Sequence, residues 1–385
     1  MSTVTGRIVE NEVFNVSSGG TATETIVNYG GQMIVSSGGT AVQTILMSGT
    51  ISGSCGSNLT WELNTASGTL WIRGTGEMDN YSYSAAGGTV SPFMKNTQIK
   101  NIIIEEGVTS IGNYAFYNCT AATLVSLPES LTAIGENAFY QCTALKTLYV
   151  PDNVTKVGKD AFVRCESLAE VRLSENLTEL GDHAFGACYS LKGIVLPEGL
   201  TKLSNSLFET CSAMTEVTIP SSVVSIGNNV FQYCSKLTVV ILPDGVTTIG
   251  DYAFADCTAL AKIEIPGSVS KIADNAFLNC STLSLHGEEF FGHGIYGPGG
   301  SYAESFASKR KLPFITGPMS TDPWTPPPIS PPPSPPPDVP TTTTPPGVMY
   351  VSSGGMLKGS LTIESGATVS AASGAIIDLD RKSVV

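Results

Sequence analysis

Apolar residues recur through the middle of the chain with a period of 23 residues. Phenylalanine stands at positions 116, 139, 162, 185, 208, 231, 254 and 277, and cysteine follows three residues later at 119, 142, 165, 188, 211, 234, 257 and 280. Of the nine cysteines only Cys55 lies outside this series. A fixed period of this length indicates supersecondary units that bury their apolar positions by stacking on one another.

Each unit contains an alternating apolar pair, such as Val240 and Leu242, that proline follows in six of the seven units where the pair is complete. Alternation bounded by proline predicts a short strand with one buried face. A second apolar pair, Val246 and Ile249 in this unit, precedes Gly250, which predicts a corner. The Ala-Phe-x-x-Cys segment that follows has the spacing of a helical or 3₁₀ turn. The pattern therefore predicts a repeat solenoid, mainly β, with short helical or 3₁₀ turns.

The consensus Leu-x-x-Val-x-Leu-Pro-x-x-Val-x-x-Ile-Gly-x-x-Ala-Phe-x-x-Cys resembles the BspA-type leucine-rich repeat of bacterial surface proteins, over about residues 101–285. The resemblance implies a right-handed leucine-rich-repeat coil of eight 23-residue units. It also implies an interaction or adhesion scaffold rather than an enzyme.

Both ends of the solenoid need covering, because open sheet edges promote aggregation. Residues 59–63 and 69–73 flank a Ser-Gly turn and predict a hairpin, with Trp61 and Trp71 available to cover the first coil. Ser301 and Glu304 form a capping box that predicts a helix to about Lys311. We expect Tyr302 and Phe306, four residues apart, to lie on one face of that helix.

A second repeat type flanks the first. The segment Val-Ser-Ser-Gly-Gly-Thr-Ala begins at Val16 and again at Val35, and Val-Ser-Ser-Gly-Gly returns at Val351. Strand pieces between Gly-Gly corners predict a narrow β-helix or β-roll. These segments resemble the passenger repeats of AIDA-type autotransporter adhesins. That resemblance implies candidate glycosylation at Ser17, Ser18, Ser36 and Ser37.

Composition divides the chain into six expected segments. Thirteen of the 23 prolines lie between Pro323 and Pro346, which indicates a semi-rigid polyproline II spacer. The expected segments are an AIDA-like β-repeat (1–50), an N-terminal hairpin cap (51–100), BspA-type repeats (101–285), a C-terminal cap with a short helix (286–317), a Pro/Thr-rich linker (318–347) and a second AIDA-like segment (348–385).

The charge balance excludes several partners. The 20 Lys and Arg against 33 Asp and Glu give a net charge of −13, whereas nucleic-acid binding requires clustered cations. No apolar stretch reaches the roughly 18 residues of a membrane helix, so we expect no membrane insertion of this chain. The first residues lack the apolar region of a secretory signal, so export of this chain would need a longer parent chain or another route.

Candidate chemistry is sparse. Stacked coils would bring the cysteines within disulfide distance, but their Cβ vectors should run parallel, and buried cysteine is a small hydrophobe. We expect no metal site, since no Cys-x-x-Cys pair occurs, and no cofactor. The three histidines lie outside any catalytic motif. We therefore expect no enzyme.

One residue per coil should point outward between the two buried strand positions. Stacking would align these residues into a stripe: Tyr149, Arg172, Val195, Thr218, Ile241 and Glu264, with Ser126 before them. Two interpretations of its apolar members stay open, contact with a partner and simple strand propensity. We expect a monomeric adhesin or interaction scaffold, outside the cell or on a bacterial surface, that binds a protein or glycan on host or neighbouring cells. The alternatives are a structural stalk without a ligand and an accessory, glycan-active module.

Overall fold

The computed structural model describes residues 51–284 and 292–319 completely, and outside these ranges it describes only the backbone of short strands. Two compact units divide the chain: residues 1–53, 62–70 and 333–385 form one, and residues 54–61 and 71–332 form the other. The candidate glycosylation positions and nearly all of the proline-rich segment lie outside the described residues.

Three rows of short parallel strands make up the described N-terminal part of the first unit. They are β1 (Thr3–Thr5), β2 (Ile8–Val9), β3 (Val13–Val16), β4 (Thr21–Thr23), β5 (Ile26–Val27), β6 (Gln32–Val35), β7 (Thr40–Val42) and β8 (Ile45–Leu46), in the orders β1-β4-β7, β2-β5-β8 and β3-β6. Val16 lies opposite Val35, so the 19-residue period of the sequence corresponds to one coil. Near the C-terminus, β31 (Met356–Gly359) pairs in parallel with β32 (Ile376–Leu379).

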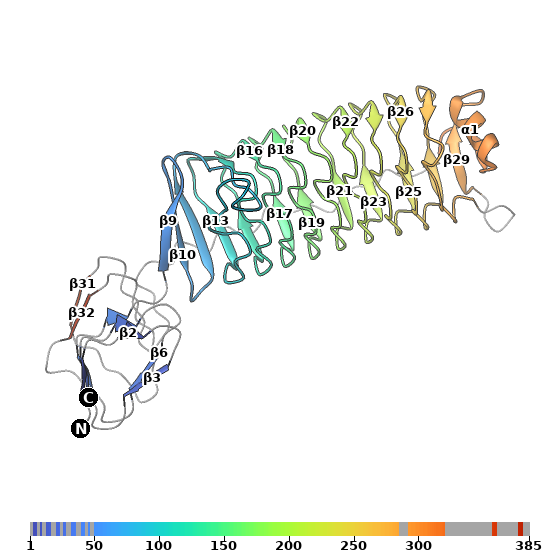
Figure 1. The fold of residues 1–385 in the computed structure, drawn as a ribbon. Helices are drawn as coiled ribbons and strands as arrows, with labels where there is room; N and C mark the ends of the chain where they lie inside the picture. The colour runs from blue at the N-terminus through green and yellow to red at the C-terminus, as the bar shows by residue number, and fades with distance from the viewer. Residues whose placement is uncertain are drawn as a thin grey trace. The chain divides into compact units, whose positions relative to one another are not determined.

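The second unit is a β-solenoid with two rows of parallel strands (Figure 1). The first row contains β13 (Asn101–Ile104), β15 (Leu124–Ser126), β17 (Thr147–Tyr149), β19 (Glu170–Arg172), β21 (Gly193–Val195), β23 (Glu216–Thr218), β25 (Val239–Ile241), β27 (Lys262–Glu264), β29 (Gly294–Gly297) and β30 (Phe314–Thr316). The second row contains β12 (Gly76–Glu77), β14 (Val108–Ile111), β16 (Ala133–Ile134), β18 (Lys156–Val157), β20 (Glu179–Leu180), β22 (Lys202–Leu203), β24 (Ser225–Ile226), β26 (Thr248–Ile249) and β28 (Lys271–Ile272). The predicted mainly-β solenoid is thus confirmed, with about nine turns in its described part.

The Ala-Phe-x-x-Cys segments form consecutive turns, closed by i→i−3 hydrogen bonds such as that from the Cys142 N–H to the carbonyl of Phe139 (3.2 Å), and do not continue into a regular helix. In the typical coil the residue before this segment and its fourth residue are left-handed, for example Asn137 (φ 54°) and Gln141 (φ 60°). This conformation interrupts any helix. It also turns the two N–H groups out of their own coil, so that Asn137 donates to the carbonyl of Lys159 (2.9 Å) and Gln141 to that of Val163 (2.7 Å). In the residues that the structure describes, the one helix is α1 (Tyr302–Arg310).

Hydrogen bonds between coils run in opposite senses on opposite sides of the solenoid. On the turn side, N–H groups donate to the following coil, as Asn137 does. On the side of the second strand row they donate to the preceding coil: Thr155 to the carbonyl of Thr132 (3.0 Å) and Gly158 to that of Ile134 (2.8 Å). Successive coils are therefore joined on both sides of their apolar interior.

The interior contains a stack of phenylalanine rings and a parallel column of thiols. Ring centroids of neighbouring coils are 5.1 Å apart for Phe116 and Phe139 and 6.1 Å apart for Phe185 and Phe208. Phe93, 23 residues before Phe116, extends the stack by one ring, at 5.3 Å. Each thiol of the ladder donates to the carbonyl of a phenylalanine 26 residues earlier, as Cys165 does to Phe139 (3.4 Å). All nine cysteines are buried and free.

A hairpin precedes the stack of coils. Strands β9 (Thr50–Gly56), β10 (Leu59–Asn64) and β11 (Thr69–Gly74) continue the first sheet in the order β15-β13-β11-β10-β9. The indole of Trp61 meets the ring of Phe93 edge to face, with centroids 5.4 Å apart. An aromatic ring from the hairpin therefore covers the exposed side of the first phenylalanine.

Helix α1 covers the other end. Ser301 Oγ accepts the N–H of Glu304 at 3.3 Å, and the Glu304 carboxylate accepts the N–H of Gly300 at 2.6 Å. Phe306 packs against Phe277, with centroids 6.0 Å apart. Tyr302, one turn before Phe306, remains 44% exposed, whereas Phe306 is buried. The small Ala303 is the buried residue of that first turn.

Candidate functional site

The structure brings the residues of the predicted stripe into neighbouring positions along the first strand row. Tyr149 lies opposite Arg172, Val195 opposite Thr218, and Ile241 opposite Glu264 in the parallel ladders. Each except Thr218, which follows the half-buried Val217, comes directly after a buried strand residue such as Leu148 or Ile194. Alternation along a strand then directs the stripe residues to the outer face.

In the N-terminal part of the stripe, Arg172 contacts both an aromatic ring and two carboxylates. The Arg172 guanidinium lies over the Tyr149 ring, 4.7 Å from its centroid. One of its nitrogens is 2.8 Å from an Asp152 carboxylate oxygen and 3.7 Å from Glu175. The hydrogen bond from Arg172 lowers the pKa of the Asp152 carboxyl from its ordinary value. This cluster presents an aromatic ring with a fixed cation stacked on it.

The central part of the stripe exposes apolar side chains. Val195 is 40% exposed and Ile241 44% exposed, with the exposed Thr218 between them. At the C-terminal end, a Glu264 carboxylate oxygen accepts the N–H of Met319 at 3.2 Å. Glu264 therefore contributes to the cover of the last coils, and Tyr149 to Ile241 form the more accessible part.

A second outward column runs beside the stripe, which the sequence analysis did not include. Its members start each three-residue strand and are Thr147, Glu170, Gly193, Glu216, Val239 and Lys262. They lie two residues before the stripe residues, and period-two alternation would have identified them. Because position 193 is glycine, no second-column side chain stands beside Val195 on the outer face of this coil.

A tyrosine cluster lies on the turn side of the first coils. The rings of Tyr117 and Tyr140 stack with centroids 4.7 Å apart and an angle of 2° between their planes. Tyr83 meets Tyr117 edge to face at 5.4 Å, and the Lys95 ammonium lies 5.0 Å from the Tyr83 centroid. Burial, and then the neighbouring Tyr140, raises the pKa of the Tyr117 phenol. Sequence reasoning missed this cluster because Tyr83 lies outside the repeats.

The thiol ladder lacks the features of a reactive site. Burial raises the pKa of Cys165 and of Cys211 to about 12, and a reactive thiol needs a lowered pKa and exposure. Within residues 51–284 and 292–319, no group of three or more His, Cys, Asp or Glu side chains is arranged to hold a metal ion. The helix in that part of the chain is too short and too polar to cross a membrane.

Comparison with known proteins gives a family match and several similar structures. A family model described as "BspA type Leucine rich repeat region" matches residues 91–215 and 202–285, in six copies. A leucine-rich repeat protein from Bacteroides ovatus is 24% identical, with 63% of this chain and 70% of that one covered and a TM-score of 0.44. A leucine-rich repeat protein from T. pallidum is 27% identical, with 48% and 91% covered and a TM-score of 0.38. No curated protein matches the chain.

Proposed function

The chain belongs to the BspA-type leucine-rich repeat family, and we propose that it is a non-enzymatic adhesin whose solenoid binds a protein or glycan on host or neighbouring cells. The proposed contact surface is the stripe from Tyr149 to Ile241 with the second outward column beside it. Stacked repeats of this kind provide extended surfaces for binding, and leucine-rich repeat proteins are scaffolds rather than a catalytic class.

The half-exposed Tyr149 and the exposed aliphatic side chains of the stripe carry this proposal. Interfaces are enriched in tyrosine and arginine, and a few such residues supply most of the binding energy. Here Tyr149 and Arg172 are already held in contact at 4.7 Å, so that little side-chain entropy remains to be lost on binding. Val195 and Ile241 extend the same row with apolar surface.

The proposal includes a location and a context. We propose that the chain acts outside the cell on a bacterial surface, as a monomer within an autotransporter passenger. The proline-rich segment 318–347 would be a spacer between the solenoid and the AIDA-like segment 348–385, with the other AIDA-like repeats in 1–50. The 19-residue coil of β3 and β6 supports a stacked repeat at the N-terminus.

Binding of purified variants to immobilised matrix proteins, mucins and bacterial glycans tests the stripe. A Tyr149→Ala, Val195→Ser, Ile241→Ser variant should lose at least tenfold in affinity for the ligand that the unchanged chain binds, because hot-spot truncations cost more than about 1 kcal/mol each. Val224→Ser is the matched control, since Val224 is 48% exposed but lies outside the stripe.

Equal binding by the triple variant and the control would remove the stripe from the proposal. Absence of binding across the whole panel, with the folded chain, would favour the alternative function, a stalk that projects other segments. The continuous phenylalanine stack, which joins every described coil to the next, is the observation that favours this alternative.

A further inference from the structure

The second strand row is interrupted once among the described coils, between β20 and β22. Its strands form one ladder from β12 to β20 and another from β22 to β28. The stack of rings is also widest at this point: Phe185 and Phe208 are 6.1 Å apart, against 5.3 Å for Phe162 and Phe185 before them and 5.6 Å for Phe208 and Phe231 after them.

Two recurring hydrogen bonds are missing at the interruption. In the coils before it, Thr178 N–H donates to the carbonyl of Thr155 (2.9 Å) and Gly181 N–H to that of Val157 (2.9 Å). The equivalent donors, the N–H groups of Thr201 and Ser204, have no backbone acceptor among the described residues. The repeat geometry directs both toward Thr178 and Leu180 across the gap.

Ser204 explains the gap. Glycine occupies its position in six other coils, at 112, 135, 158, 181, 227 and 250. A Cβ at Gly181 would lie 2.4 Å from the backbone nitrogen of Lys159, so a side chain at this corner requires the backbone to shift. Ser204 carries a side chain, and its hydroxyl donates to the Leu180 carbonyl at 2.6 Å. The hydroxyl thereby occupies the carbonyl that the Ser204 N–H would otherwise use as its acceptor. Ala273, without a hydroxyl, keeps the usual bond to the carbonyl of Ile249 at 2.9 Å.

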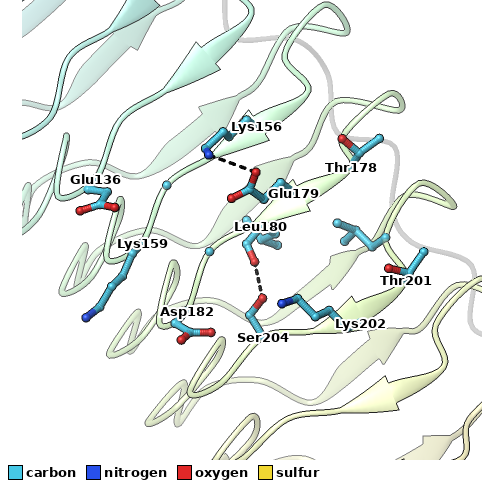
Figure 2. A pocket seen from close by; sticks show the side chains of 13 residues that line it. Glu136, Lys156, Lys159, Thr178, Glu179, Leu180, Asp182, Thr201, Lys202 and Ser204 are labelled. Carbon is cyan, nitrogen blue, oxygen red and sulfur yellow. Dashed lines mark hydrogen bonds and ion pairs between the residues drawn. The ribbon is translucent and has the colours of Figure 1, made fainter.

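The gap opens into a polar cavity of about 260 Å³ that Ser204, Leu180 and the neighbouring corner residues line (Figure 2). Its two charge columns alternate in sign: Lys156, Glu179 and Lys202 in one, Glu136, Lys159 and Asp182 in the other. Lys156 and Glu179 are ion-paired at 3.1 Å. Lys202, beyond the gap, has no ion-pair partner in the described part of the chain.

The side of the cavity formed by β22 is therefore rich in donors for an anion. It supplies the Lys202 ammonium and the N–H groups of Thr201 and Ser204, a combination that binds carboxylates through charge-assisted hydrogen bonds. The opposite side supplies acceptors: the carbonyl of Thr178 and the carboxylate of Glu136, with the Asp182 carboxylate beside them already accepting the N–H of Asn205 at 2.9 Å. Acceptors of this kind require a ligand that also carries hydroxyl donors.

We propose that this cavity binds one acidic sugar residue, with its carboxylate at Lys202, Thr201 and Ser204 and its hydroxyls at the opposite acceptors. A carboxylate alone leaves the Thr178 carbonyl and the Glu136 carboxylate without donors, and a neutral sugar leaves the Lys202 ammonium without an anion. The volume is many times the roughly 30 Å³ of a water molecule and just below the roughly 300 Å³ at which sites for drug-sized ligands begin. One pyranose ring therefore suits it.

The cavity lies on the second strand row and does not depend on the stripe. Ser204→Gly is the decisive variant, because it should restore the two hydrogen bonds and close the gap without removing any charged side chain. The variant should also be at least as stable as the unchanged chain. A loss of binding in Ser204→Gly therefore cannot result from unfolding.

Titration of the full chain with glucuronic acid, followed by amide NMR shifts, tests the proposal. We expect shifts centred on Thr201 and Ser204, and at least a tenfold weaker affinity in both Ser204→Gly and Lys202→Ala. Lys271→Ala is the matched control: Lys271 holds the same coil position where the sheet is closed, and its loss should leave the affinity unchanged. Glucose and acetate should each bind at least tenfold more weakly than glucuronic acid.

Three outcomes would overturn the proposal: no shift at these amides, unchanged affinity in Ser204→Gly, or acetate binding as tightly as glucuronic acid. The last would mean that a carboxylate alone occupies the cavity. None of these variants alters the stripe, so the result is separate from that of the adhesin test.

Discussion

Single residues at the corners determine how closely the coils stack. At Gly158 a Cβ would lie 2.7 Å from the nitrogen of Glu136 and 2.8 Å from the carbonyl carbon of Gly135. Both are backbone atoms of the preceding coil, so the two coils must shift apart to accommodate a methyl group. The glycine is required by this close approach and not by its φ angle. Ser204 illustrates the consequence of a side chain at the same position.

Gly158→Ala should lower the free energy of unfolding by about 1–3 kcal/mol, the usual cost of overpacking. Urea unfolding followed by circular dichroism measures it. Gly87→Ala is the control, because a Cβ there meets its nearest neighbour, the Ser82 Cβ, at an ordinary 3.6 Å. Equal stability of the two variants would mean that the corner can relax around a methyl group.

At the scale of elements, helix α1 stabilises the end of the solenoid mainly through the ring of Phe306. The helix is nine residues long, and its buried side chains are Ala303, Phe306 and Ala307. Phe306 closes the column of stacked phenylalanines at Phe277. Without it the last ring of the column would face water.

Phe306→Ala should cost about 3–5 kcal/mol, the range for truncating a buried phenylalanine, and expose the end of the solenoid. Hydrogen exchange should then accelerate first in β28 and β29, and the variant should associate at high concentration. Tyr302→Ala, on the exposed side of the same helix, should change neither. Uniform acceleration across all coils would contradict this local effect.

For the whole molecule, the thiol ladder makes stability depend on pH in the alkaline range. Burial raises the pKa of Cys119, Cys165, Cys211 and Cys280 from 9.0 to about 12, and those of Cys142, Cys188, Cys234 and Cys257 well above 9.0. Below pH 9 both states keep these protons. Between pH 9 and about 12 the unfolded chain loses protons that the folded chain retains, so stability falls as pH rises.

Each ladder thiol should contribute a slope of about 1.4 kcal/mol per pH unit in that window. Urea unfolding at several pH values above 9 measures the slope, and Cys165→Ala should reduce it by the share of one thiol. A free energy of unfolding that stays constant from neutral pH to about pH 11 would contradict the prediction.

The features that recur in every coil could be predicted from the sequence, apart from the detailed backbone of the turns. The effect of a residue that departs from the repeat could not. The columns at Phe116 and Cys119 and the outward position of Tyr149 follow from spacing alone, because each coil imposes the same environment on equivalent residues. The left-handed pair at Asn137 and Gln141 was not predicted, since three-residue spacing is also that of a helix. Ser204 was visible in the sequence as one of two exceptions to the corner glycines, with Ala273, but its effect depends on where the hydroxyl points.

The opposite senses of the hydrogen bonds on the two sides of the solenoid affect its electrostatics. In an α-helix all peptide dipoles point the same way, so a partial charge builds up at each end. Here the peptides of the turn side, such as Asn137, are opposed by those of the corner side, such as Thr155. Each added coil therefore contributes peptide dipoles of both orientations. An array of this design can therefore grow by whole repeats without developing a polarised tip that would have to be neutralised.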